Sequence, residues 1–252
     1  VQGHLMLYRF VSLGIALMFL PAGFLGGWSS KAPEPWQYWE YNNPANDQTI
    51  DHSIWDRFLQ KYVHADGNGY NKFAYSRVTE KDKAGLKKYI DTLAKIEITE
   101  RAKPVQLAYW INLYNALTVD VVLEHYPVSS IREIRLGGIL SRGPWDGELI
   151  EIEGEPITLN VVEHEILRPI WADPRIHYAI NCASVSCPNL HNRAFSAANT
   201  DSLLDQLATD YLSHARGLKI ENDTVTVSSI FGWFAFDFGN SEEKIIEHIA
   251  NY

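Results

Sequence analysis

The segment from Val105 to Tyr126 constrains the fold more than any other part of the sequence. Its apolar residues lie on nearly every side of a helical projection. Its few polar exceptions are Gln106, Asn112, Asn115, Thr118, Asp120 and Glu124. A helix that is apolar on most faces is normally buried at the centre of a domain. Pro104 suits the first turn of such a helix and Pro127 ends it. The sequence therefore predicts a domain built around one buried central helix.

The segments on either side of this helix predict its packing partners. Helical periodicity predicts helices over residues 51–63, 80–96, 160–170, 202–216 and 241–249. β-Prone runs predict strands over 131–136 and 176–180, and turn signals predict hairpins over 148–158 and 218–227. Because strands and helices do not alternate regularly, we expect a helix-rich α+β single domain with a small, mostly antiparallel sheet.

The N-terminal 32 residues predict export. Residues 1–5 are expected to precede a native start at Met6, and Arg9 is followed by a charge-free run from Phe10 to Gly27. This pattern is typical of a signal peptide or, at this length, of a membrane anchor, with a buried core helix as the alternative. We expect residues 1–32 to direct the protein to the periplasm, either free or membrane-associated through residues 6–27. Residues 33–49 then form a linker or irregular arm, and residues 50–252 form the domain.

The charge balance limits the choice of partner. The chain has 22 Lys and Arg residues against 31 Asp and Glu residues, a formal net charge of −9. An acidic chain without a basic stripe argues against a nucleic-acid partner. The expected partner is a small molecule or a peptide, and no motif calls for a cofactor.

The segment from His177 to Pro188 holds both cysteines of the chain, Cys182 and Cys187. We expect it to be the functional centre. Three polar side chains are expected near it: His164 and Glu163 on the preceding helix, and Arg168 one turn further along. Arg168 suits a carboxylate-binding role or an ion pair.

Several pieces of the chain, taken together, resemble the family catalogued as domain of unknown function 547 (DUF547). The pieces are Trp55-Asp56, Tyr62-Val63, residues 108–118 (AYWINLYNALT), residues 163–168 (EHEILR), residues 173–182 (DPRIHYAINC), Ser186-Cys187-Pro188, Phe231-Gly232-Trp233 and Asp237-Phe238. They extend from about Ile50 to Asp237. The resemblance implies a shared fold and a shared site built from these pieces, but no reaction, because the family name records none.

The first hypothesis for the site is nucleophilic catalysis. A thiolate attacks, and a nearby imidazole lowers the thiol pKa and carries the proton. Cys182 is the candidate nucleophile, with His164 or His177 as base and Glu163 to orient the imidazole. His177 and Cys182 differ by an odd number of positions, so in an ideal strand their side chains face opposite ways. His164 is therefore the preferred base.

The second hypothesis is a structural disulfide between Cys182 and Cys187, which an oxidising compartment would preserve. A bridged pair cannot act as a resting thiolate. Two further readings rank lower. A metal site would use both cysteines with His164 and His177, although the cysteine spacing is wider than usual. A thiol–disulfide exchange site lacks the two-residue spacing of the common redox motif.

Two functions follow and both stay open. The leading one is a cysteine-dependent hydrolase or transferase acting on an amide- or thioester-like substrate. Asn112, Asn115 and Asn181, together with Arg168 and Cys187, would supply binding contacts. The rival is a non-enzymatic exported module, stapled by a Cys182–Cys187 disulfide, that presents the same pocket to a peptide or protein.

Overall fold

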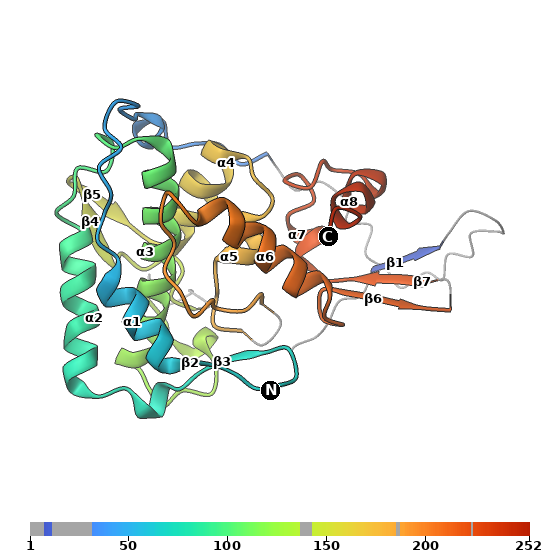
Figure 1. Cartoon of the computed structure of the whole chain (residues 1–252), viewed down its shortest axis with the longest axis horizontal. Coiled ribbons are helices and arrows are strands. Elements are labelled where there is room, and N and C mark those ends of the chain that lie inside the picture. Colours follow the sequence, from blue (N-terminus) through green and yellow to red (C-terminus); the bar gives the residue numbers. More distant parts are fainter. Residues whose placement is uncertain (1–7, 12–31, 137–142, 185–186, 223) are drawn as a thin grey trace.

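The computed structural model describes residues 8–11, 32–136, 143–184, 187–222 and 224–252. Its centre is the helix α3 (Lys103–Glu124), with Pro104 in the first turn. Nearly all of its side chains are buried, including those of Asn112 and Asn115. Two amphipathic helices, α1 (Ser53–Tyr62) and α2 (Glu80–Leu93), lie beside it in Figure 1. The predicted buried central helix is confirmed.

Spacing in the sequence explains which faces of α1 and α2 are buried. In α2, the core residues recur at intervals of three and four: Leu86, Tyr89, Ile90 and Leu93. This periodicity places them on one helical face. The Thr79 hydroxyl accepts a hydrogen bond from the backbone N–H of Asp82 and so caps the helix N-terminus.

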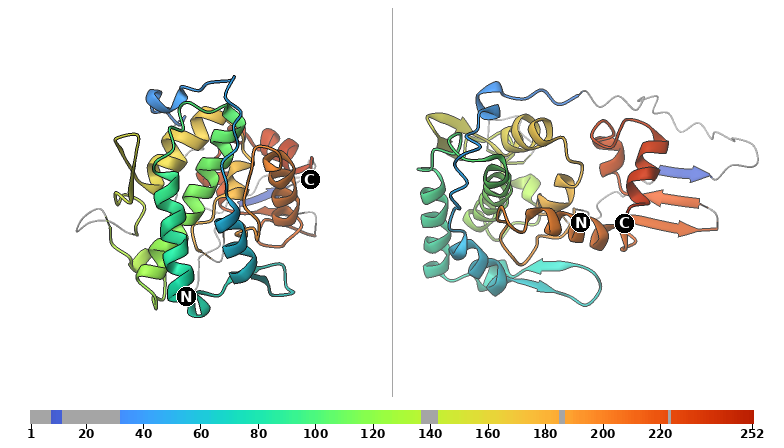
Figure 2. Two further views of the ribbon diagram at one scale, coloured as in Figure 1. Left: turned by 60° about the vertical axis from the view of Figure 1, so that its left-hand side comes forward. Right: turned by 45° about the horizontal axis from the view of Figure 1, so that its top comes forward.

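All strand pairs of the described residues are antiparallel. The larger sheet has the order β1 (Tyr8–Val11), β7 (Thr224–Val227) and β6 (Leu218–Glu221), with Leu218 opposite Val227. The two small hairpins are β2 (Val63–Ala65) with β3 (Asn71–Phe73), and β4 (Ile150–Ile152) with β5 (Glu155–Ile157). The hairpins predicted over residues 148–158 and 218–227 are present as β4–β5 and β6–β7. The predicted helix-rich α+β fold is confirmed. Figure 2 shows the larger sheet extending from the helical body, next to the C-terminal helix.

Two predicted strands are wrong. Residues 131–136 contain a 3₁₀ turn, Ile131–Glu133, and residues 176–180 contain the helical turn α5 (Ile176–Ala179). Every residue of α5 is buried. A short, fully buried apolar run has the same pattern as a strand or as a helical turn, so periodicity does not separate them. The Asp173 carboxylate accepts a hydrogen bond from the backbone N–H of Arg175, the residue that precedes this helical turn.

The predicted helix over residues 160–170 is present in an altered form. Residues Val161–Leu167 form a π-helix that continues into α4 (Arg168–Trp171). The Thr158 hydroxyl accepts a hydrogen bond from the backbone N–H of Val161, in the first turn of this helix. π-Helical turns are rare and occur often at functional sites. The remaining helices are α6 (Thr200–Leu212), α7 (Ile230–Trp233) and α8 (Glu242–Ile249).

The arm over residues 33–49 is packed against the domain. It contains the 3₁₀ turn Gln37–Glu40, where Trp39 is 1% exposed and meets Trp110 of α3 edge to face. Another 3₁₀ turn, Tyr75–Arg77, follows β3.

The apolar segment over residues 6–27 lies outside the described residues except for β1. Within the described part of the chain, no helix combines the length and apolar character needed to cross a membrane.

Candidate functional site

One cavity of about 260 Å³ brings together Glu163, His164, His177, Cys182 and Cys187. We call it the His177 cavity. The rest of its lining is mostly apolar and aromatic: Tyr114, Trp145, Asn160, Ile180, Pro188, Ile230, Trp233 and Phe234. Apolar walls with a few convergent polar groups are typical of small-ligand pockets. Five residues that the sequence predicts for the site thus line one cavity.

His177 is held by a buried carboxylate that sequence reasoning did not assign to the site. Its Nε2 lies 2.7 Å from Oδ2 of Asp237, and the two side chains are 3% and 10% exposed. Because an ionised carboxylate only accepts, Nε2 carries the proton, and the lone pair of the neutral ring is on Nδ1. The ring also stacks on Phe234 at 4.1 Å between centroids. His177 is thus fixed in both tautomer and orientation.

Arg168 completes this network. Its Nε and Nη2 bind the two oxygens of Asp237 at 2.6 and 3.1 Å, and its guanidinium lies over the Phe234 ring. Burial alone raises the pKa of Asp237, but the hydrogen bonds from His177 and Arg168 outweigh it and hold that pKa below its usual value. Asp237 therefore stays ionised between the two donors.

His164, the base that the sequence favours, is in contact with Arg168. Its Nδ1 lies 2.9 Å from Nη1 of Arg168. A guanidinium group only donates, so Nδ1 accepts and the proton of the neutral ring is on Nε2. Burial is the main cause that lowers the pKa of His164, opposed by Glu163 and assisted by Arg168. The geometry thus makes His164 a neutral hydrogen-bond donor.

Glu163 points toward the central helix. Its Oε2 accepts the hydroxyl proton of Tyr114 at 3.0 Å. Burial and the charge of Glu163 raise the pKa of Tyr114 well above its usual value, so this hydroxyl remains a donor. The two carboxylates of the site therefore have separate partners: Glu163 is held by α3, and Asp237 holds His177.

The cysteines form a disulfide, Cys182–Cys187, that lies in the wall of the cavity. Residues 185–186, including Ser186 of the family motif, lie outside the described residues. In this state Cys182 is not a thiolate. Among the residues that the structure describes, no group of three or more His, Cys, Asp or Glu side chains is arranged to hold a metal ion.

The three asparagines expected to bind ligand are engaged with the backbone. Asn112 pairs with both backbone groups of Phe195, and Asn115 binds the carbonyl of Ala179 and the N–H of Asn181. Asn181 binds the carbonyl of Pro188 and the N–H of Ala183. The first two fix the segments on either side of the site to α3, and they do not line the His177 cavity.

A second cavity, of about 360 Å³, shares Cys187 and Pro188 with the first. We call it the Arg216 cavity. Its other lining residues are Asp66, Tyr70, Asn71, Lys72, Asn181, Ser184, Asn189 and Arg216. Cys187 and Pro188 thus lie between an aromatic cavity with acid–base groups and a polar cavity.

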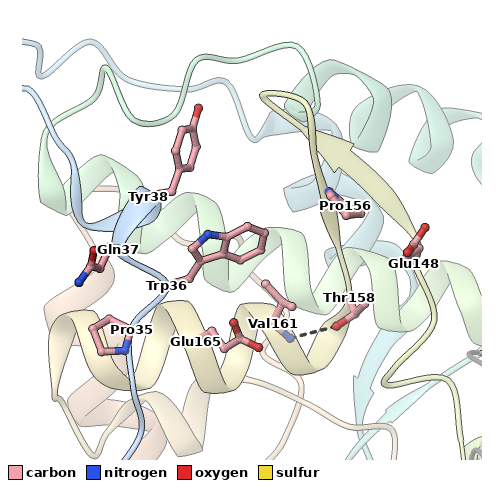
Figure 3. A pocket seen from close by; sticks show the side chains of 9 residues that line it. All are labelled: Pro35, Trp36, Gln37, Tyr38, Glu148, Pro156, Thr158, Val161 and Glu165. Carbon is pink, nitrogen blue, oxygen red and sulfur yellow. Dashed lines mark hydrogen bonds between the residues drawn. The ribbon is translucent and has the colours of Figure 1, made fainter.

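A third hollow, of about 700 Å³, is larger but shallow (Figure 3). It lies between the arm, with Trp36 and Tyr38, and the π-helix, with Val161 and Glu165. Its polar side chains include no imidazole and no thiol. Size alone therefore does not identify the site, and the smaller His177 cavity holds the chemical groups.

The site residues that the sequence did not assign come from distant segments: Tyr114, Trp145, Trp233, Phe234 and Asp237. Asp237 is 60 residues from His177. The only sequence signal for it was the motif Asp237-Phe238.

Comparisons with known proteins give one match. The family model described as "Protein of unknown function, DUF547" matches residues 98–212. This range includes α3, the π-helix, His177 and both cysteines, whereas Asp237 lies beyond it. No curated protein and no solved structure matches the chain.

Proposed function

Because residues 98–212 belong to the DUF547 family, whose description gives no function, we propose from the site itself that the protein is a cysteine-dependent hydrolase or transferase. The substrate would be amide- or thioester-like, and the disulfide would be the oxidised resting form. The observation that carries the proposal is the buried His177–Asp237 pair in the same cavity as Cys182. It supplies an oriented imidazole whose Nδ1 has no hydrogen-bond partner among the described residues, the arrangement by which a base activates a thiol.

The proposal changes two roles from the sequence hypothesis. His164 was preferred as base because an ideal strand separates His177 from Cys182. Residues 176–179 form a helical turn, so that argument no longer applies. Asp237 replaces Glu163 as the orienting acid. His164 would instead donate its Nε2 proton to the oxygen on which negative charge develops.

The proposed reaction begins with reduction. A dithiol reductant exchanges with the Cys182–Cys187 bridge, giving two cysteine thiols and an oxidised dithiol. The proton of the Cys182 thiol passes to Nδ1 of His177, and the sulfur attacks the carbonyl carbon. The leaving amine or thiol takes that proton as the acyl–sulfur bond forms. Water, or a second acceptor, then releases the acyl group.

A second function is favoured by the disulfide itself. A bridge that persists in use leaves a rigid pocket without a nucleophile, which suits a module that binds a peptide or small molecule. Both candidates agree with our proposal that the protein is exported, because disulfides persist in oxidising compartments.

The test compares thiol reactivity after reduction by a dithiol. We expect Cys182 to react with iodoacetamide near neutral pH at least about tenfold faster than Cys187, because an activated thiol exists largely as thiolate. His177→Ala and Asp237→Asn should remove most of this difference, while His164→Gln should keep it. Site-resolved alkylation rates by mass spectrometry give the readout.

A thioester probe tests turnover directly. Reduced protein should form an acyl adduct on Cys182 that Cys182→Ser lacks. Equal alkylation of the two cysteines, together with no adduct, would refute the enzyme and leave the binding module.

A further inference from the structure

The Arg216 cavity contains a buried arginine that has no ion-pair partner among the described residues. Arg216 is 8% exposed, yet among the described residues no carboxylate lies within ion-pair distance of it. Arginine is rarely buried this deeply without a partner, because removing a charge from water is unfavourable. A buried guanidinium group beside a cavity can instead take its anion from a ligand.

The contacts that Arg216 does make satisfy it only partly. Its guanidinium carbon lies 4.6 Å from the ring centroid of Tyr70 and 5.3 Å from that of Tyr211. Nη2 has one long hydrogen bond, of 3.4 Å, to the carbonyl of Gly69, and Nε has no partner among the described residues. The two rings fix the plane of the group and leave donors unused.

The acid in the same cavity is engaged elsewhere. Oδ2 of Asp66 pairs with Lys72 at 3.1 Å, and Oδ1 accepts the backbone N–H groups of Asn68 and Tyr70. Both oxygens of Asp66 are therefore occupied, and its position is fixed by the loop between β2 and β3. Arg216 therefore has no anionic partner in the part of the chain that the structure describes.

We propose that the Arg216 cavity binds a carboxylate of the ligand whose reacting part occupies the His177 cavity. The inference rests on the proposed function in treating the two cavities as one ligand site, since they share Cys187 and Pro188. A guanidinium group matches a carboxylate in shape and binds it through two parallel hydrogen bonds. A phosphate dianion fits less well, because Lys72, the other cation of the cavity, is already paired with Asp66, so Arg216 alone would face the two charges. The ligand class is thus a peptide-like molecule with a free carboxylate.

The experiment uses oxidised protein, in which Cys182 does not react, so its result is independent of catalysis. N-acetyl-alanyl-alanine and its C-terminal amide are titrated separately, with the backbone amide signals of Gly69 to Asn71 as readout. The free acid should bind at least about tenfold more tightly than the amide, as expected for hydrogen bonds to a charged group. Equal affinities would overturn the proposal.

Two variants separate Arg216 from the general charge of the protein. Arg216→Gln should reduce the acid-to-amide affinity ratio to about one, whereas Lys219→Gln, which also removes one positive charge but lines neither cavity, should keep most of it. An equal loss in both variants, or a ratio unchanged in Arg216→Gln, would contradict the assignment. If Arg216→Gln does not fold, Arg216→Lys keeps the charge but loses the planar fork. Its ratio should then be smaller than that of the wild type, and an unchanged ratio would overturn the proposal.

Discussion

Arg168 and Arg216 both have little solvent exposure, yet their surroundings are opposite. Arg168 binds both oxygens of Asp237, and that carboxylate also holds His177. Arg216 lies between two tyrosine rings, and no carboxylate of the described residues is bound to it. A satisfied buried network fixes its members in one arrangement. An unsatisfied cation keeps its capacity for a partner that arrives from outside.

The difference assigns separate tasks to the two cavities. In the His177 cavity, each charged group has its position set before any ligand binds, as catalysis by preorganised groups requires. In the Arg216 cavity the guanidinium group is fixed by aromatic contacts. Under the proposed function, the His177 cavity would carry the chemistry and the Arg216 cavity would recognise the ligand.

The largest expected effect tests this contrast directly. Arg168→Met should lower the free energy of unfolding by about 3–5 kcal/mol, because it leaves the buried Asp237 without one of its two donors. Arg216→Met should change it by no more than about 1 kcal/mol. The methionine loses cation–π contacts with the two tyrosines but also removes a buried, unpaired charge. Urea unfolding of the oxidised proteins measures both. Equal losses would mean that Arg216 has a stabilising partner comparable to Asp237.

Loss of the Cys182–Cys187 disulfide is expected to give the second-largest change in stability. Cys187→Ser should lower the free energy of unfolding by about 2 kcal/mol, because a bridge across five residues removes modest entropy from the unfolded chain. Adding a dithiol to wild-type protein should reproduce most of that loss. The denaturation midpoints with and without reductant provide the measurement. A midpoint that reductant leaves unchanged would show that the bridge resists reduction, which would argue against its role as a resting form.

The contrast also explains what the sequence could predict. The central helix was predictable because twenty or so residues repeat one signal, and the hairpins were predictable because Gly154 and Asn222 mark their turns. The segment His177–Pro188 was located through its cysteines and motif. The helical turn at residues 176–179 was not predictable, because four buried residues are too few to show a periodicity. Asp237 was missed as a site residue because only folding brings α5 and the segment after α7 together.

Arg216 shows a second limit. At the end of a predicted amphipathic helix, an arginine is normally a solvated residue, and nothing in the sequence shows that Tyr70 and Tyr211 enclose it. That no described carboxylate pairs with it is a property of the packed structure. Buried charges of this kind are therefore found by checking the partners of each buried group in the structure, not from a sequence motif.

The smallest expected effect concerns protonation in the His177 cavity. His164 has a folded-state pKa below its usual value of about 6.5, mainly through burial. When pH falls below about 6.5, the unfolded chain takes up this proton before the folded protein does. The contribution of His164 to stability is therefore present above that pH and declines as pH falls toward the folded-state pKa. The slope for one proton is at most about 1.4 kcal/mol per pH unit.

Glu163 provides the matched variant for this prediction. Its charge raises the pKa of His164 against the effect of burial, so Glu163→Gln should lower the NMR titration midpoint of His164 further, while its amide oxygen still accepts the Tyr114 hydroxyl. His164→Gln identifies the resonance and should flatten the decline in stability between pH 7 and pH 5. His52 and His248 must be left intact in both variants, because burial lowers the pKa of each to about 4 and they add to the same decline. A midpoint that rises in Glu163→Gln would mean that Glu163 does not act on His164 through its charge. The imidazole would then not be the neutral donor that its contact with Arg168 indicates.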